Sequence, residues 1–341
     1  MELWQEARCA VVSTSAKKVR KKLLLFVLLG WVLLLIGDRV DELRVYQGAQ
    51  IAMYTIALAS IVLLTGYSGQ VSLGNGAMMA VGGYAAALTL NNLQTPIWSA
   101  FMMAILVAAL FGAFLGLAAA RLSGSYLAGT TLALAVGLPG IANQFSFLGG
   151  EPGLPFDVGF PPSQLGDDFP PFRWIYWISC LLALVALLIT SNILQSRYGR
   201  TWRAIRGNSL AAELSGIHSS QMKVLAFTVS SGLAGLAGAV LAMTISLVAP
   251  GSYTLALSFA LVTGAVLAGI SSLPGVVLGG FILVVIPQIA DALAASLGNE
   301  DKLNSYLPGL FVSVLLILSV IYTPNGPGEN LRKHFHKKSA H

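Results

Sequence analysis

Charged residues are scarce in this sequence: Asp, Glu, Lys and Arg make up 10% of its 341 residues, and hydrophobic residues make up 56%. Soluble domains carry about a quarter charged residues. So few charges cannot cover the outer surface that a soluble fold of this size exposes to water. The composition therefore excludes a disordered chain and an ordinary soluble enzyme, and it indicates a protein that crosses a membrane several times.

Cysteine is nearly absent, and the two that occur are Cys9 in a basic leader and Cys180 in an apolar run. A disulfide between them is not expected, so a disulfide-stabilised fold is excluded. The sequence also lacks a GxxxxGK[ST] phosphate-binding loop and an HExxH motif. We therefore expect that the chain is not an enzyme and binds no cofactor or metal of its own.

Long apolar runs, bounded by polar residues, glycine or proline, predict ten membrane-spanning helices. The runs cover residues 22–38, 50–66, 76–90, 97–120, 126–147, 174–194, 222–248, 254–270, 275–297 and 307–322. The predicted fold is an all-α polytopic bundle that occupies residues 22–322. A basic N-terminal segment, 1–21, precedes the bundle, and a tail, 323–341, follows it.

The positions of lysine and arginine predict how the bundle is oriented. With a cytoplasmic N-terminus, 16 of the 20 basic residues lie on the cytoplasmic side, and the other four are Arg39, Arg44, Arg173 and Lys302. This bias agrees with the positive-inside rule. Both termini and a basic loop at 195–221 are then cytoplasmic, and a Pro- and Gly-rich loop at 148–173 is external. The net charge of +6 is thus a consequence of topology, and no nucleic-acid partner is expected.

The external loop at 148–173 has two interpretations, because it either caps the mouth of a pathway or serves as a solvated connector. Glycines at four-residue spacing predict close packing of helices elsewhere. These are Gly112 and Gly116, then Gly275 and Gly279, together with a cluster formed by Gly232, Gly235 and Gly238.

Residues 66–75, GYSGQVSLGN, are too polar and too rich in glycine to face lipid as a regular helix. Irregular backbone at membrane depth is stable only where protein or a water-filled cavity satisfies its polar groups. Polar side chains here and in the neighbouring runs are candidates for lining a pathway: Gln70, Ser72, Asn75, Thr130, Thr131 and Thr263.

Asp291 is the only ionisable residue well inside a predicted span. Such residues are usually functional or paired, although Asp291 lies near the outer end of its helix, where simple exposure explains it equally well. A pathway so poor in charge favours a net-neutral solute over an ion or a phosphate ester.

The cytoplasmic loop contains four arginines and a predicted short helix from Thr201 to Leu214 that ends before Gly216. Its apolar residues are expected to form one face; they are Trp202, Ile205, Leu210 and Leu214. This face either binds a partner or lies in the membrane interface, with the arginines setting orientation.

Four blocks of the sequence resemble the LivM-type permeases of ABC importers for branched-chain amino acids. The blocks are residues 66–89, 149–155, 198–242 and 271–287, and the resemblance covers most of the chain after about residue 45. It implies a bacterial inner-membrane permease that pairs with a LivH-type sister permease, a periplasmic solute-binding protein and two cytoplasmic ATPase subunits, which use the ATP. Urea, short amides and aromatic acids are alternative cargoes, since the same architecture serves them.

The resemblance also implies roles for individual residues. Residues 201–217 would form the segment that docks on an ATPase subunit, with Arg203 and Arg206 holding it in place. The coupling candidates are Trp202, Arg203, Ile205, Arg206, Ala211, Ala212, Glu213 and Gly216, and the pathway candidates are Gly69, Gln70, Ser72, Gly74, Asn75, Thr263 and Asp291. Two departures from the family pattern are the order Ala-Ala-Glu in place of Glu-Ala-Ala, and Asn75 where relatives commonly have His.

A stand-alone secondary transporter is the main alternative. The glycine-interrupted segments 66–76 and 264–280 lie one in each half of the chain and resemble the paired broken helices of inverted-repeat carriers. Ion coupling, however, usually needs carboxylates within the membrane, and only Asp291 is available. A purely structural membrane protein is a third possibility, against which the polar block at 66–75 argues.

Overall fold

The computed structural model describes residues 26–297 apart from 36, 38, 94, 122–124 and 160–168, together with Val314 and Ile317. The expected segments 1–21 and 323–341 and nearly all of the tenth span lie outside these residues.

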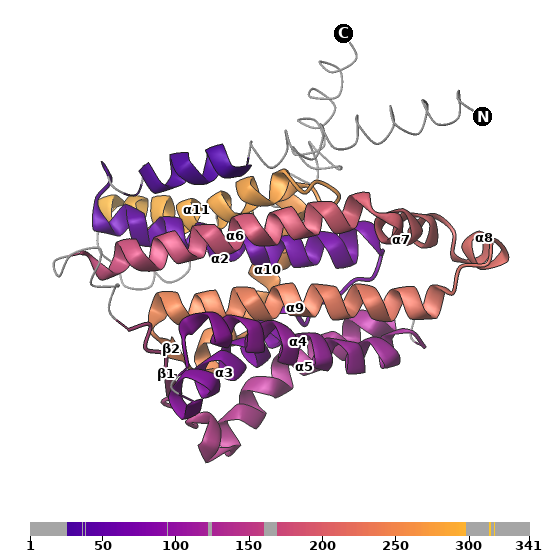
Figure 1. Ribbon diagram of the computed structural model, residues 1–341, viewed down its shortest axis with the longest axis horizontal. Helices are drawn as coiled ribbons and strands as arrows, with labels where there is room; N and C mark the ends of the chain where they lie inside the picture. The colour runs from indigo at the N-terminus through magenta and orange to yellow at the C-terminus, as the bar shows by residue number, and fades with distance from the viewer. Residues whose placement is uncertain are drawn as a thin grey trace, which may run out of the picture.

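Long helices run along the long axis of the molecule (Figure 1). The elements before the middle of the chain are α2 (Glu42–Ile61), the π-helix η1 (Val62–Tyr67), α3 (Asn75–Leu93), α4 (Ile97–Ala119), α5 (Ser125–Gln144), the 3-10 helix η2 (Ser146–Leu148) and strand β1 (Leu154–Pro155). They are followed by α6 (Pro171–Gln195), α7 (Arg197–Gly207), α8 (Ser209–Leu214), α9 (Ser219–Ile245), strand β2 (Leu247–Val248), the 3-10 helix η4 (Pro250–Tyr253), α10 (Leu255–Ala268) and α11 (Gly275–Leu297).

Six helices of the described chain are long and apolar enough to cross a membrane, whereas the sequence predicted ten spans. The six are Glu42–Tyr67, Ile97–Ala119, Tyr126–Gln144, Pro171–Gln195, Ser219–Ile245 and Pro250–Ala268. Phe26–Leu35 and Gly275–Ile289 are shorter apolar helices. The run at 76–90 became α3, whose glycines and asparagines lower its hydropathy. The polytopic all-α fold is therefore confirmed, but the number ten is not.

Helix α9 lies in the middle of the bundle and packs against α4, α3 and α2. Glycines make these contacts close: a Cβ at Gly238 would overlap the Met79 carbonyl oxygen, and a Cβ at Gly112 would overlap the Ser231 side chain. Gly82 of α3 meets Gly235 of α9 in the same way. The close packing predicted from glycine spacing is thus confirmed, and it explains how α3 is surrounded by protein.

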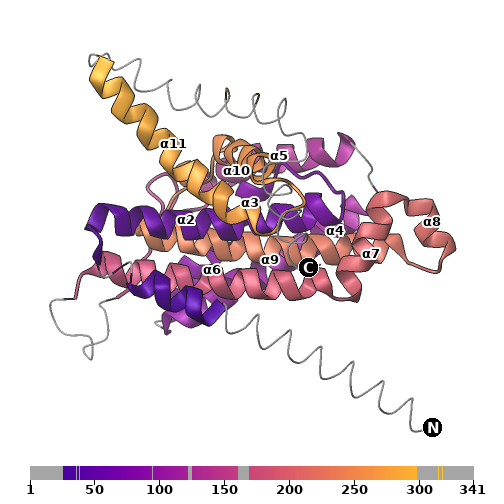
Figure 2. The ribbon, with the colours of Figure 1, turned by 90° about the horizontal axis from the view of Figure 1, so that it is seen from above.

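The connections between helices gather at the two ends of the bundle. At one end β1 pairs antiparallel with β2, with Leu154 opposite Val248, and Asn91 Nδ2 donates a 3.1 Å hydrogen bond to the Pro155 carbonyl. At the other end lie α7 and α8 (Figure 1). Figure 2 shows that α11 leans away from the remaining helices. Most described basic residues belong to segments at the α7–α8 end: Arg121, Arg197, Arg200, Arg203, Arg206 and Lys223.

Candidate translocation and coupling site

The chain leaves regular helix between α2 and α3. Helix α2 continues into the π-helix η1, and residues 68–74 are irregular until α3 begins at Asn75. Gly69 has φ of 74°, a left-handed conformation that favours glycine. The irregular backbone expected at 66–75 is therefore confirmed for 68–74, a segment we call the broken segment, while Asn75 belongs to a helix.

The polar side chains of this region are buried rather than exposed. Gln70 and Ser72 are each 5% exposed and Asn75 is 2% exposed. Asn75 Nδ2 donates to Ser60 Oγ of α2 at 2.7 Å, and Ser230 Oγ of α9 donates to the Ser60 carbonyl at 3.0 Å. These bonds join α2, α3 and α9 at one point, because each polar group buried in an apolar bundle needs a partner.

The other side of the broken segment is held by α5 and α10. The Leu73 amide donates to Thr131 Oγ1 at 3.0 Å, and the Gly76 amide donates to Ser258 Oγ at 3.1 Å. Thr131 also packs so close to Gly74 that a Cβ there would lie 2.8 Å from the Thr131 carbonyl oxygen. The broken segment and the start of α3 are thus fixed to four surrounding helices.

Sequence reasoning found part of this network and missed part of it. Thr131 was among the polar candidates, whereas Ser60, Ser230 and Ser258 were not. The signal that could have found them is serine within a long apolar run, alone at Ser60 and Ser258 and paired at Ser230; each of the three is 1% exposed or less. Thr263 lies on α10 beyond Ser258 and is half-buried.

Two of the predicted pathway residues, Thr263 and Asp291, have no hydrogen bond to the broken segment among those that the structure describes. Within the described residues, no hydrogen bond joins Thr263 to the broken segment. The backbone of Asp291 belongs to α11, but its side chain lies outside the part of the chain that the structure describes. The role of both residues in a pathway stays a prediction. Val71, by contrast, is 46% exposed and gives the broken segment an outward surface.

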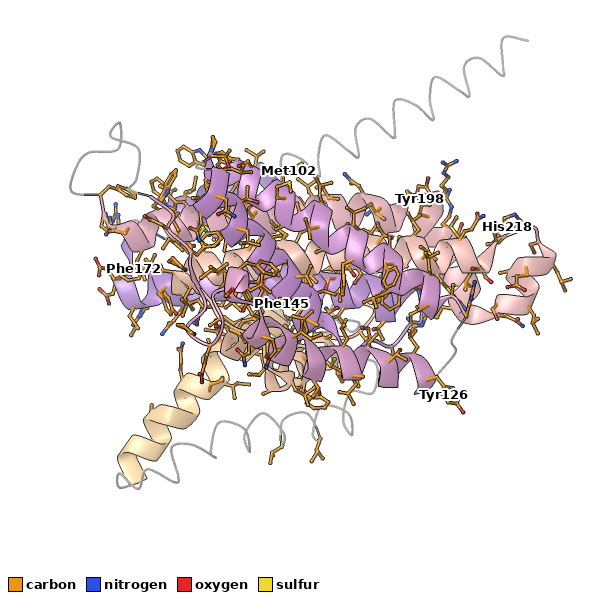
Figure 3. All side chains as sticks on the ribbon, turned by 90° about the horizontal axis from the view of Figure 1, so that it is seen from below. Met102, Tyr126, Phe145, Phe172, Tyr198 and His218 are labelled. Atoms are coloured by element: carbon orange, nitrogen blue, oxygen red, sulfur yellow. The ribbon has the colours of Figure 1, made fainter. Side chains whose placement is uncertain are left out.

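The outer face of helix α5 carries several glycines between exposed larger residues such as Val136 and Ile141. A Cβ placed at Gly129, Gly137 or Gly140 would meet no described atom within 4 Å. Thr130 on the same helix is exposed, and its hydroxyl donates only to its own helix, to the Leu127 carbonyl. The face opposite Thr131 is therefore open along much of α5. In Figure 3 the labelled Tyr126 marks the end of α5 that lies toward the α7–α8 end.

The segment 197–214 forms two helices, α7 and α8, which corrects the single helix predicted from Thr201 to Leu214. Asn208 interrupts it with extended backbone (φ −157°, ψ 109°). Its side-chain Oδ1 accepts a 3.1 Å hydrogen bond from the Ala211 amide, so Asn208 caps α8. The sequence Gly207-Asn208-Ser209 carried this signal, because asparagine and serine compete with the backbone within helices but stabilise their first turn.

The four apolar residues of this segment do not share one face. Trp202 is 1% exposed and donates from Nε1 to the Met222 carbonyl of α9 at 2.9 Å, and Ile205 is also buried. Leu210 and Leu214 on α8 are 72% and 91% exposed. The first pair anchors α7 to the bundle, and the second pair projects from its end.

Two arginines connect α7 to the region of the broken segment. Arg206 Nη1 donates to the Gly66 carbonyl and, at 3.2 Å, to Ser271 Oγ between α10 and α11. The Arg203 guanidinium lies 5.7 Å from the centre of the Tyr67 ring, within the range of a cation–π contact. These contacts join α7 directly to η1.

The end of α8 is less constrained. Ala211 and Glu213 are exposed, and Glu213 accepts a hydrogen bond from Ser219 Oγ at the start of α9. Ala212 is buried, and Gly216, with φ of 82°, lets the chain turn into α9. A cavity of about 410 Å³ lies between Glu213 and His218, and Figure 3 places His218 at this end of the molecule. In the described residues, no three metal-ligating side chains are grouped.

The chain is similar to known transport proteins over most of its length. A family model described as the permease component of branched-chain amino acid transport systems matches residues 46–320. The high-affinity branched-chain amino acid transport system permease protein LivM of Salmonella typhimurium is 27% identical, over 92% of this chain and 75% of that protein. LivM of Escherichia coli is 28% identical, over 80% of this chain and 67% of that protein.

A second type of permease from the same systems also matches. The permease protein LivH of Escherichia coli is 33% identical over 42% of this chain and 44% of its own length. No solved structure is significantly similar to the chain.

Proposed function

Because the chain belongs to the family of branched-chain amino acid transport permeases, we propose that it is the membrane-spanning permease subunit of an ATP-driven importer whose cargo is a branched-chain amino acid. The single observation that carries this proposal is the family match over residues 46–320. The buried polar network around the broken segment supports it, since a bundle with a purely structural role has no need of an interrupted helix at membrane depth.

The proposed topology has ten spans with both termini in the cytoplasm of a bacterium, and the protein lies in the inner membrane. Support comes from the helices that connect at two opposite ends and from the basic residues at the α7–α8 end, as the positive-inside rule requires. Under this topology α7 and α8 are cytoplasmic, and the paired strands β1 and β2 are periplasmic.

We place the second permease subunit, of the LivH type, against the outer face of α5. Small residues let helix backbones approach closely in membranes, and Gly129, Gly137 and Gly140 leave that face open. The chain is similar to both LivM and LivH proteins, so the sister subunit is expected to present a corresponding surface.

The translocation pathway then runs between the two permeases. Its wall on this subunit includes the exposed part of the broken segment from Gly69 to Asn75, with Thr263 and Asp291 contributing from α10 and α11. The buried network behind it keeps the wall in place. Such a pathway is short of charge, which suits a zwitterionic amino acid better than a net-charged solute.

Two cytoplasmic ATPase subunits complete the importer together with a periplasmic solute-binding protein. The chain binds no cofactor and is not an enzyme; ATP is used by the partner subunits. Exposed Leu210 and Leu214 on α8, with the neighbouring cavity at Glu213, form the surface offered to an ATPase subunit. ATP-driven closure of the ATPases moves α7, and Arg206 carries that movement to η1, shifting the permeases between two packings.

The proposal is tested by purifying the affinity-tagged chain from its native membrane and identifying the proteins that accompany it. We expect a second permease and a P-loop ATPase to co-purify with the chain. The ATPase subunit should no longer co-purify with the double variant Leu210→Ser, Leu214→Ser. A chain that purifies alone from gently solubilised membranes, and that transports solute in vesicles without ATP, would show a secondary transporter instead.

A further inference from the structure

A cavity of about 590 Å³ lies at the α7–α8 end, away from α5 and outside the buried network. Its walls come from five places in the chain: the helix Phe26–Leu35, η1, α6, α7 and the start of α11 with the turn before it. Arg203, Tyr67 and Ser271 also belong to the contacts that join α7 to η1, but the cavity itself has no role in the transport function proposed above. We propose that this cavity binds an anionic glycerophospholipid.

The lining of the cavity changes from apolar to polar toward the end of the bundle. Along α6 it begins with Leu184 and Leu187 and continues with Ser191 and Gln195, next to α7. These residues follow one another at intervals of three or four and therefore lie on the same side of the helix. A wall that is apolar at depth and polar at the membrane surface matches the two parts of a phospholipid.

The apolar part of the cavity is open to the side of the bundle. Phe26 and Leu29 face it from the first described helix, and Val277 faces it from α11. Leu29 is 44% exposed and Val277 is 46% exposed, so these walls continue into outer surface of the bundle. A lipid can therefore enter the cavity laterally from the bilayer.

The polar part contains one positive charge, which has no acidic partner among the described residues of the lining. Arg203 lines the cavity, and its Nε donates to the Gly199 carbonyl at 3.1 Å. Within the described residues, its two terminal nitrogens have no hydrogen-bond partner, and no acidic side chain lines the cavity. A guanidinium with two free donors pairs well with a phosphate oxygen pair, and Ser271 Oγ lies in the same wall.

The sequence carries further positive charge shortly before the helix Phe26–Leu35, which lines the cavity. Five of the six residues at 17–22 are lysine or arginine, and three leucines separate this cluster from Phe26 in the sequence. Basic clusters directly on the cytoplasmic side of a membrane helix attract anionic lipids by about 1 kcal/mol for each charge. Charge complementarity therefore selects an anionic phospholipid over a zwitterionic one.

The experiment measures lipid binding to the purified full-length chain by native mass spectrometry. Phosphatidylglycerol and phosphatidylcholine with identical acyl chains are added in equal amounts to delipidated protein. We expect about tenfold more phosphatidylglycerol than phosphatidylcholine bound to the wild-type chain, as one charge-assisted contact provides. The Arg203→Gln variant should lose this preference, and Arg203→Lys should keep part of it.

Two further variants separate the cavity from general surface charge. Arg197 stacks on Tyr198 and does not line the cavity, so Arg197→Gln is the matched control and should bind as the wild type does. Leu187→Trp fills the apolar part without changing charge and should reduce binding of both lipids.

Unchanged preference in Arg203→Gln, or full binding in Leu187→Trp, would overturn the proposal. Inorganic phosphate that displaces phosphatidylglycerol at equal concentration would also overturn it, because the site would then bind a free anion rather than a lipid. The measurement does not involve transport, so it is independent of the cargo proposed above.

Discussion

The outer faces of α4 and α5 differ, although the two helices are consecutive in the chain. Helix α4 exposes bulky apolar side chains, among them Leu106, Leu110 and Phe114, which are 52% to 71% exposed. Helix α5 exposes fewer bulky apolar side chains, among them Val136 and Ile141, and between them it exposes Gly129, Gly137 and the polar Thr130. Bulky side chains suit lipid, whereas small and polar ones suit a protein neighbour or a pathway. Two helices with the same apparent role in the sequence thus have different neighbours.

The inner face of α4 should be the least tolerant of added volume. Gly112 lies against Ser231 of α9, and a leucine there has no space. Gly112→Leu is expected to destabilise the bundle by about 3 kcal/mol or more, since neither backbone can yield. Folded yield in detergent and thermal unfolding measure this. A variant that is produced and melts like the wild type would mean that α4 and α9 are not packed in this way.

The outer face of α5 should accept the same substitution without loss of the fold. Gly137→Leu meets no described atom, so the melting temperature of the isolated chain should be unchanged. Co-purification of the sister permease is expected to fall about tenfold, because the leucine holds the two backbones apart. Leu106→Phe, which adds volume to the outer face of α4, is the control and should retain the sister. Loss of the sister in both variants, or in neither, would remove the distinction between the two faces.

The link from α7 to η1 is tested at Arg206. Arg206→Gln removes its charged contact with the Gly66 carbonyl, and ATP-driven uptake is expected to fall several-fold, by up to about tenfold. Arg200 lies on the same helix and bonds only to the nearby Gln195 carbonyl, so Arg200→Gln serves as the control. Uptake that is equal in both variants would show that α7 does not act on η1 through Arg206.

The outer face of α4 should show the smallest effect. Leu110 is 71% exposed, so Leu110→Ala removes little packing within the bundle. We expect a change in unfolding free energy within about 0.5 kcal/mol and unchanged uptake. A larger loss of stability, or loss of the sister permease, would mean that α4 also faces protein.

Much of the fold could be predicted from the sequence because membrane helices are recognised by their length and hydropathy. The break at 66–75 followed from its glycines and polar residues in the same way. Helix α3 was predicted as a span, yet its buried glycines are tolerated only because α9 and α4 enclose it. That enclosure depends on which helices are neighbours, and no local pattern encodes it.

The site was harder to predict than the fold. The partners of Asn75 and Leu73 are Ser60 and Thr131, which lie 15 and 58 positions away in the chain. Composition places these residues in apolar runs but does not pair them. Burial of Trp202 was equally hidden, since its apolar spacing also fits a partner-binding face. The capping role of Asn208, by contrast, was visible in the sequence and was overlooked.

The most direct test of the transport function is leucine uptake by proteoliposomes that contain this chain, its sister permease and the ATPase subunits. With binding protein and leucine outside and ATP inside, uptake should be rapid. It should stop without ATP or without binding protein, and dissipating the proton and sodium gradients should leave it unchanged. Uptake by this chain alone, driven by an ion gradient in the absence of ATP, would contradict its role as an importer subunit.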